Sequence, residues 1–134
     1  MAVFRDATEA DLDALCAIED IGWSRAQFKS ELGNGLFVAG SVEGFAALRT
    51  VGDEAQLYMI GVASRKRRSG LGGIILKECF RRSKAFGCVK MTLEVSAANT
   101  AAKALYESGG FCVVGHRTKY YNDGADALLM DASI

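Results

Sequence analysis

The chain has 134 residues, of which half are apolar and 24% are charged, a composition typical of one globular domain with a single hydrophobic core. The formal net charge is zero, which gives no reason to expect nucleic-acid binding. No apolar run is long enough to span a membrane, and the N-terminal residues lack the pattern of a secretory signal. We therefore expect a single cytoplasmic domain over residues 1–134, with no membrane or nucleic-acid partner.

The cysteines do not suggest a metal site. Cys16, Cys79, Cys88 and Cys112 form no CxxC pair, and His116 is the single histidine. A zinc site needs clustered ligands. We therefore expect no metal and interpret the cysteines as small apolar groups.

The first half of the chain predicts a short strand, two helices and a β-meander. A strand at residues 3–5 precedes a helix that Thr8 caps, and Ser24 with Gln27 forms the capping box of a second helix. Three strands follow, at residues 36–41, 44–51 and 55–63. The links between them are too short for a crossover, so the meander is antiparallel.

The second half alternates helices and strands. Residues 65–73, RKRRSGLGG, form a basic loop that opens a helix ending near Gly87. A strand at 89–95, a helix at 99–108 and strands at 111–116 and 125–131 complete the chain. The order β-α-α-β-β-β-α-β-α-β-β predicts an α/β (α+β) fold with a single mixed, mostly antiparallel central sheet flanked by helices.

The basic loop has the chemistry of a pyrophosphate site. A helix N-terminus presents unpaired N–H groups and a partial positive charge, glycines let phosphate oxygens approach, and arginines add forked donors. Gly72 is followed by Gly73 and Ile74, which excludes a Walker A loop, and Ile75 stands where a dinucleotide fingerprint needs glycine. The alternative is a solvated basic turn at a helix start.

A family resemblance makes the loop more specific. The run Arg67-Arg68-Ser69-Gly70-Leu71-Gly72 resembles the Q/R-x-x-G-x-G/A motif of the GNAT superfamily of N-acetyltransferases. The resemblance implies that the loop, with Gly73, holds the pyrophosphate of acetyl-coenzyme A (acetyl-CoA). It also implies that the preceding strand, which carries Ile60, Gly61 and Val62, pairs with the pantetheine arm, chiefly at Ile60 and Val62.

A second set of residues resembles a subfamily. Leu93-Glu94-Val95, Asn99, Ala104-Leu105-Tyr106-Glu107 and Gly110-Phe111 are similar to the L-E-V…N…A-L-Y-E…G-F pattern of bacterial ribosomal-protein-alanine N-acetyltransferases. The resemblance implies that Glu94 accepts the proton of the amine, that Tyr106 protonates the coenzyme A thiolate and that Asn99 contacts the cofactor. From the sequence pattern alone, Glu94 is a strand carboxylate that lies either in a partly dry cleft or exposed on the strand, Tyr106 is a core aromatic residue and Asn99 is a helix N-cap.

The resemblance implies direct transfer of the acetyl group to a primary amine, with a protein N-terminus as the acceptor. Trp23-Ser24 and the run Arg117 to Tyr121 resemble acceptor-site segments of the same enzymes, so Tyr120 and Tyr121 are expected to line the peptide channel. The link between the first helix and Trp23 is shorter than expected for that subfamily. A small-molecule amine acetyltransferase and a non-catalytic CoA-binding module are the alternatives.

Overall fold

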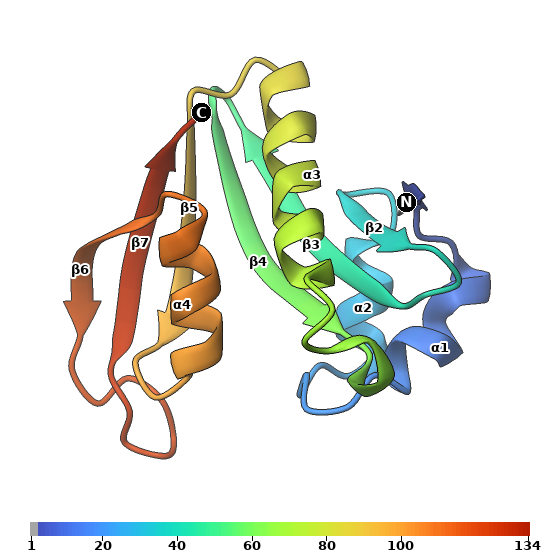
Figure 1. Ribbon diagram of the computed structural model, residues 1–134, viewed down its shortest axis with the longest axis horizontal. Helices are drawn as coiled ribbons and strands as arrows, with labels where there is room; N and C mark the ends of the chain where they lie inside the picture. The colour runs from blue at the N-terminus through green and yellow to red at the C-terminus, as the bar shows by residue number, and fades with distance from the viewer. Residues whose placement is uncertain (1–2) are drawn as a thin grey trace. The chain divides into compact units, whose positions relative to one another are not determined.

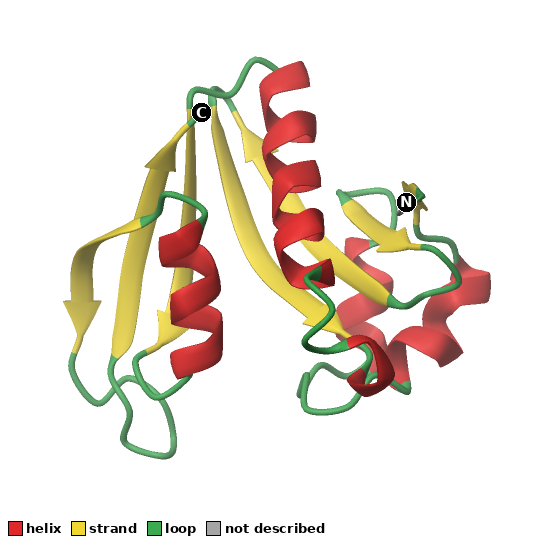
Figure 2. Cartoon of the chain, in the orientation of Figure 1, coloured by secondary structure: helices red, strands yellow, loops and turns green. Residues whose placement is uncertain are grey.

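The computed structural model describes residues 3–134 of the chain (Figure 1). Its strands are β1 (Phe4–Asp6), β2 (Leu36–Ala39), β3 (Gly44–Val51), β4 (Glu54–Val62), β5 (Lys90–Ser96), β6 (Cys112–Arg117) and β7 (Ala127–Ser133). Its helices are α1 (Leu12–Cys16), α2 (Arg25–Glu31), α3 (Leu71–Ala85) and α4 (Thr100–Ser108), with single 3₁₀ turns η1 (Glu9–Asp11) and η2 (Ser64–Lys66) (Figure 2). The order of elements is the one predicted from the sequence.

The strands follow the order β1-β2-β3-β4-β5-β7-β6 in the sheet. The pairs β1–β2, β2–β3, β5–β7 and β6–β7 are antiparallel, and β4 and β5 are parallel. The crossover between these two parallel strands is helix α3, as parallel pairing requires. The prediction of a mixed, mostly antiparallel sheet flanked by helices is confirmed.

The chain divides into two compact units, each of which is described by itself. Unit 1 consists of residues 1–49 and 58–79, and unit 2 of residues 50–57 and 80–134. The expectation of one domain over the whole chain stays a prediction.

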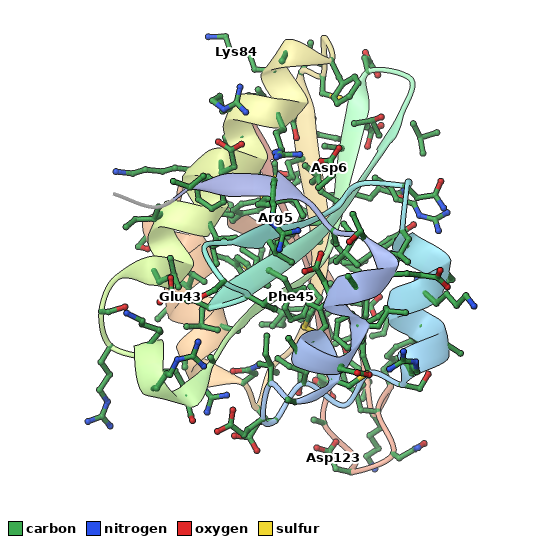
Figure 3. The ribbon with its side chains drawn as sticks, turned by 90° about the vertical axis from the view of Figure 1, so that its right-hand side faces the viewer. Arg5, Asp6, Glu43, Phe45, Lys84 and Asp123 are labelled. Carbon is green, nitrogen blue, oxygen red and sulfur yellow. The ribbon has the colours of Figure 1, made fainter. Side chains whose placement is uncertain are left out.

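Unit 1 has an aromatic core beneath its short helices. The Phe28 ring lies 5.3 Å from Trp23 and 5.2 Å from Phe45, and both phenylalanines are fully buried. Figure 3 shows Phe45 on its strand among the side chains of this unit. Leu12 and Leu15 of α1 are buried in the same cluster. The apolar spacing of these helices therefore places one face of each on the sheet.

Local hydrogen bonds set where the first helices begin. Ser24 accepts from the Gln27 N–H at 3.2 Å, and Gln27 accepts from the Ser24 N–H at 2.7 Å, which confirms the predicted capping box. The helix predicted after Thr8 begins as the 3₁₀ turn η1, where Asp11 accepts from the Thr8 N–H at 2.8 Å. The Arg5 guanidinium binds both Asp11 oxygens at 2.8 Å, so strand β1 is tied to this turn.

Unit 2 is built on the ladder between β5 and β7, which runs from Lys90 opposite Ser133 to Ser96 opposite Ala127. The last strand begins two residues later than predicted. The reason is that Asp126 is held in the preceding loop, where its carbonyl accepts from Ala97 N–H at 2.8 Å and its carboxylate from Lys119 N–H at 2.8 Å. Within residues 3–134, no helix is long and apolar enough to cross a membrane.

Candidate functional site

The predicted phosphate loop joins β4 to α3 in unit 1. It makes one 3₁₀ turn, η2, and then passes through two positive φ values, 63° at Arg68 and 83° at Gly70. Helix α3 begins at Leu71, and its first hydrogen bond runs from the Ile74 N–H to the Gly70 carbonyl at 3.2 Å. Leu71, Gly72 and Gly73 therefore form the first turn of the helix, where N–H groups have no acceptor earlier in the helix.

The backbone at this helix start is open to a ligand. A Cβ atom added at Gly70 or Gly73 would meet no heavy atom within 4 Å, so open space lies beside both residues. The positive end of a 15-residue helix favours an anion in that space. The residues present therefore fit a phosphate group.

The basic side chains of the loop divide into two pairs. Lys66 forms an ion pair with Glu43 at 2.9 Å, and Arg67 forms one with Asp20 at 3.0 Å. Arg65 and Arg68 are exposed and reach no hydrogen-bond or ion-pair partner among residues 3–134. The two free guanidinium groups are thus the ones available to an anion.

Two predicted cofactor-binding side chains turn toward the protein. The Arg67 guanidinium donates to Val62 and Glu19 carbonyls as well as to Asp20. The Ser69 hydroxyl donates to the Lys66 carbonyl at 2.5 Å. A role for either side chain in holding the cofactor stays a prediction.

The strand that precedes the loop has the predicted position. The parallel β4–β5 ladder runs from Glu54 opposite Lys90 to Leu57 opposite Leu93, and it ends before Ile60 and Val62. These two residues are the ones expected to pair with the pantetheine arm. Between them, Gly61 is buried against the Phe45 ring, which a Cβ atom at Gly61 would approach to 2.3 Å.

Glu94 lies on β5 in unit 2. Its neighbours Met91, Leu93 and Val95 are buried, whereas Glu94 is exposed, which confirms the predicted alternation of faces. The Tyr121 hydroxyl donates to Glu94 Oε1 at 3.5 Å. Of the two readings that the sequence left open for Glu94, the structure therefore has the exposed strand carboxylate, contacted by the half-buried Tyr121, and not a carboxylate enclosed in a cleft.

The polar loop before β7 places Tyr121 against this carboxylate and Tyr120 against Tyr121. Burial, and after it the charge of Glu94, raises the pKa of Tyr121, so its hydroxyl stays protonated at neutral pH. The Tyr120 ring packs edge-on against Tyr121 with centroids 5.2 Å apart, and the Arg117 guanidinium lies 5.2 Å from the Tyr120 centroid. Asp123 lies at the far end of the loop (Figure 3).

The contact between Tyr121 and Glu94 is one that sequence reasoning missed. The two residues are 27 positions apart, and neither carries a motif that pairs them. The antiparallel pairing of β5 with β7 is the available signal, because the loop before β7 must end near the end of β5, where Ser96 faces Ala127. The role of Tyr120 and Tyr121 in lining a peptide channel stays a prediction.

Tyr106 of α4 is a buried residue. Its ring packs on Phe111 with centroids 5.8 Å apart, and Phe111 packs in turn on Phe80 at 5.7 Å. The expectation of a core aromatic residue is confirmed. The role of its hydroxyl as a proton donor is untested by this geometry.

Asn99 caps helix α4. Its side-chain oxygen accepts from the Ala102 N–H at 3.1 Å, as an N-cap residue does. The side chain is exposed, and its predicted contact with the cofactor stays a prediction.

Comparison with known proteins identifies the family. Residues 4–111 match the acetyltransferase (GNAT) family, which is more than half of the chain. The chain belongs to this family. It is an acetyl-CoA-dependent N-acetyltransferase, which confirms the enzyme predicted from the glycine-rich loop and the second-half pattern.

Two named relatives and one solved structure are similar to this GNAT protein over most of its chain. It is 38% identical over 116 residues to the [ribosomal protein bS18]-alanine N-acetyltransferase of Escherichia coli K12, covering 81% of this chain and 78% of the relative. It is 35% identical over 132 residues to the N-alpha-acetyltransferase RimI of Mycobacterium tuberculosis, covering 90% and 82%. The crystal structure of the E. coli ribosomal-protein-S18-alanine N-acetyltransferase superposes with a TM-score of 0.89 at 34% identity, covering 100% of this chain and 94% of that one.

Proposed function

We propose that this acetyltransferase transfers the acetyl group of acetyl-CoA to the N-terminal α-amine of a ribosomal protein that begins with alanine. The observation that carries the proposal is the 38% identity to the E. coli [ribosomal protein bS18]-alanine N-acetyltransferase, which spans 78% of that relative. The M. tuberculosis relative is named as an N-alpha-acetyltransferase. Because ribosomal proteins are made in the cytoplasm, we place the reaction there.

We assign the binding of acetyl-CoA first to the start of α3. The backbone of this helix start, open at Gly70 and Gly73, and the exposed Arg68 guanidinium supply donors for a pyrophosphate. Ile60 and Val62 follow the end of the β4–β5 ladder, which suits strand-like pairing with the amide groups of the pantetheine arm. We also assign Asn99 to the cofactor, because it matches the asparagine of the L-E-V…N…A-L-Y-E…G-F pattern.

The chemistry requires one proton to leave the amine and one to reach the sulfur. A C–N bond forms as the thioester C–S bond breaks, and the free amine is the attacking species. We assign the first proton to the exposed Glu94 carboxylate. We assign the second to Tyr106, because a phenol with a pKa near 10 holds its proton at neutral pH, and its transfer to a thiolate whose conjugate acid has a pKa of about 8.5 is uphill by only about 1.5 pKa units.

An α-amine suits this arrangement better than a lysine side chain does. Its pKa of about 7.7 to 8.0 leaves roughly a tenth of the molecules neutral at pH 7, against fewer than about a thousandth for lysine. The accessible Glu94 carboxylate has then to remove a proton from an ammonium group that is more acidic than that of lysine. The chemistry therefore favours a protein N-terminus.

The test of the acceptor uses two peptides of one sequence that starts with alanine and contains a lysine. One has a free N-terminus and the other an acetylated one. We expect the first peptide to gain the mass of one acetyl group at its α-amine and the second to remain unchanged. Acetylation of the lysine, or of polyamines with neither peptide modified, would contradict the proposal and favour a small-molecule acceptor.

The catalytic assignments are tested by Tyr106→Phe and Glu94→Gln. The phenylalanine keeps the packing on Phe111, so we expect a kcat at least tenfold lower with coenzyme A affinity unchanged within about twofold. The Glu94→Gln defect should shrink as pH rises above the pKa of the amine, because the amine then attacks without first losing a proton, and the strongly acidic proton it loses after attack can pass to solvent. A Tyr106→Phe variant as fast as the parent would refute the role of the phenol.

A further inference from the structure

The segment between α1 and α2 is joined to the segment between β4 and α3 by one guanidinium group. Arg67 Nη1 donates to the Asp20 carboxylate at 3.0 Å, Nη2 to the Glu19 carbonyl at 2.8 Å and Nε to the Val62 carbonyl at 3.1 Å. All three nitrogens of the planar fork are thus in use, on acceptors from two parts of unit 1.

A second link joins the same two segments. The Glu19 carboxylate accepts from the Ser64 hydroxyl and, at 3.5 Å, from the Ser64 backbone N–H. The Ser64 hydroxyl is also the main reason why the pKa of the Glu19 carboxyl is lowered. Residues 19 and 20 are therefore held at two points, one at Ser64 in turn η2 and one at Arg67 directly after it.

Both joined segments have backbone conformations that most residues disfavour. Asp20 has a φ of 64° and Arg68 a φ of 63°, in the left-handed region that favours glycine. Each of them is next to a residue of the two links. Such conformations persist where surrounding contacts determine them, so the hydrogen bonds of Arg67 and Glu19 hold the local shape of both segments.

The remaining charges of the loop show which groups are left for an anion. Lys66 is paired with Glu43, whereas Arg65 and Arg68 reach no partner within the described residues. Arg67 could turn to a phosphate only by giving up three hydrogen bonds, one of them to a carboxylate. Arg68 would give up no hydrogen bond, and it is closer than Arg67 to Gly70 along the chain.

We propose that Arg67 is a positioning residue: its guanidinium fixes residues 17–22, which lead into Trp23 on the acceptor side, to the cofactor loop. It thereby determines how well the acceptor binds, whereas Arg68 serves the cofactor. This inference rests on the proposed function and on the resemblance of Trp23-Ser24 to an acceptor-site segment. Its consequence is that two adjacent arginines of one motif affect two different substrates.

The experiment compares Arg67→Ala with the matched control Arg68→Ala in the full chain. For Arg67→Ala we expect the KM for the alanine peptide to rise at least tenfold, with kcat and the calorimetric Kd for coenzyme A changed less than threefold. For Arg68→Ala we expect the opposite result: the Kd for coenzyme A rises at least fivefold, and the peptide KM stays within twofold of the parent value.

The substitution Asp20→Asn tests the same contact between Arg67 and Asp20 from the other side. Asparagine tolerates the positive φ of this position. The substitution should raise the peptide KM in the same direction, and the double variant Arg67→Ala/Asp20→Asn should be no worse than Arg67→Ala alone, because the two changes remove one shared interaction. Amide hydrogen exchange in residues 17–22 should accelerate at least tenfold in Arg67→Ala and stay unchanged in Arg68→Ala.

Two outcomes would overturn the inference. One is a loss of coenzyme A affinity in Arg67→Ala equal to that of Arg68→Ala, with the peptide KM unchanged. The other is unaltered hydrogen exchange in residues 17–22. Hydrogen exchange and calorimetry need no turnover, so they report on Arg67 even if no peptide is acetylated and the proposed acceptor is wrong.

Discussion

Gly61 is the position at which a single methyl group has least room in the candidate cofactor strand. A Cβ atom there would lie 2.3 Å from the Phe45 ring and 2.7 Å from Ile21 Cδ1, both in the core of unit 1. Overpacking of this kind costs about 1 to 3 kcal/mol. We expect Gly61→Ala to lower the free energy of unfolding by that amount, measured by urea denaturation.

Gly73→Ala is the matched control for this substitution. It adds the same methyl group on the first turn of α3, where no heavy atom lies within 4 Å. Alanine is a better helix former than glycine by up to about 1 kcal/mol, so stability should hold or rise slightly. Equal losses of stability in both variants would show that the contact with Phe45 is not the cause.

The protonation of Asp11 affects the stability of the fold in acid. Its pKa is lowered from 3.8 to about 2, first by the hydrogen bonds from Arg5, and the carboxylate is buried. Because the folded pKa is the lower one, the stabilisation is complete above pH 3.8 and is lost as pH falls through about 2. We expect Asp11→Asn to lower the free energy of unfolding at pH 7 by roughly 1 to 2 kcal/mol, a range reduced because Arg5 is half-exposed.

The measurement is the free energy of unfolding of both proteins at several pH values from 6 to 2. The difference between the parent and Asp11→Asn should be constant above about pH 5 and narrow below about pH 4, since the protonated carboxyl loses the same interaction. A difference that widens on acidification would mean that the pKa of Asp11 is not lowered by folding.

Helix α4 allows the two roles of Asn99 to be separated. Its N-cap hydrogen bond to the Ala102 N–H contributes about 1 kcal/mol, and serine can replace asparagine at an N-cap. We expect Asn99→Ala to lose both stability and coenzyme A affinity, whereas Asn99→Ser keeps the stability and still loses affinity. Urea denaturation and calorimetry on the two variants provide the measurements. Full affinity in Asn99→Ser would refute the predicted contact of the amide with the cofactor.

The elements that the sequence predicts best are those with local signals at both ends. Strand β3 lies at residues 44–51 as expected, because a turn precedes it and Gly52 with Asp53 follows it. The Ser24 capping box and the Asn99 cap were likewise predictable, because each is a contact between residues three positions apart. The start of β7 was missed because the bonds that hold Asp126 come from Ala97 and Lys119.

The candidate site was predictable as a set of residues and not as a set of contacts. The glycines and arginines of residues 65–73 stand together in the chain, so their helix-start chemistry can be read directly. The bonds that decide what Arg67 and Glu94 touch join residues 47 and 27 positions apart. No local sequence pattern at Asp20 or Tyr121 indicates that these residues contact Arg67 and Glu94.

Binding of the cofactor should be measurable as stability of the whole chain. A ligand that binds only the folded state adds about 2.7 kcal/mol to the free energy of unfolding at 100 times its Kd. We expect coenzyme A to raise the urea midpoint of the parent with the m-value unchanged, since the surface exposed on unfolding stays nearly the same. Arg68→Ala should need a proportionally higher concentration for an equal shift, and Asp11→Asn, whose contacts lie in η1 and β1, should show the parental shift from a lower starting midpoint. An absent shift in folded parent protein would mean that the open helix start at Gly70 holds no coenzyme A, and the assignment of the phosphate loop would fail with it.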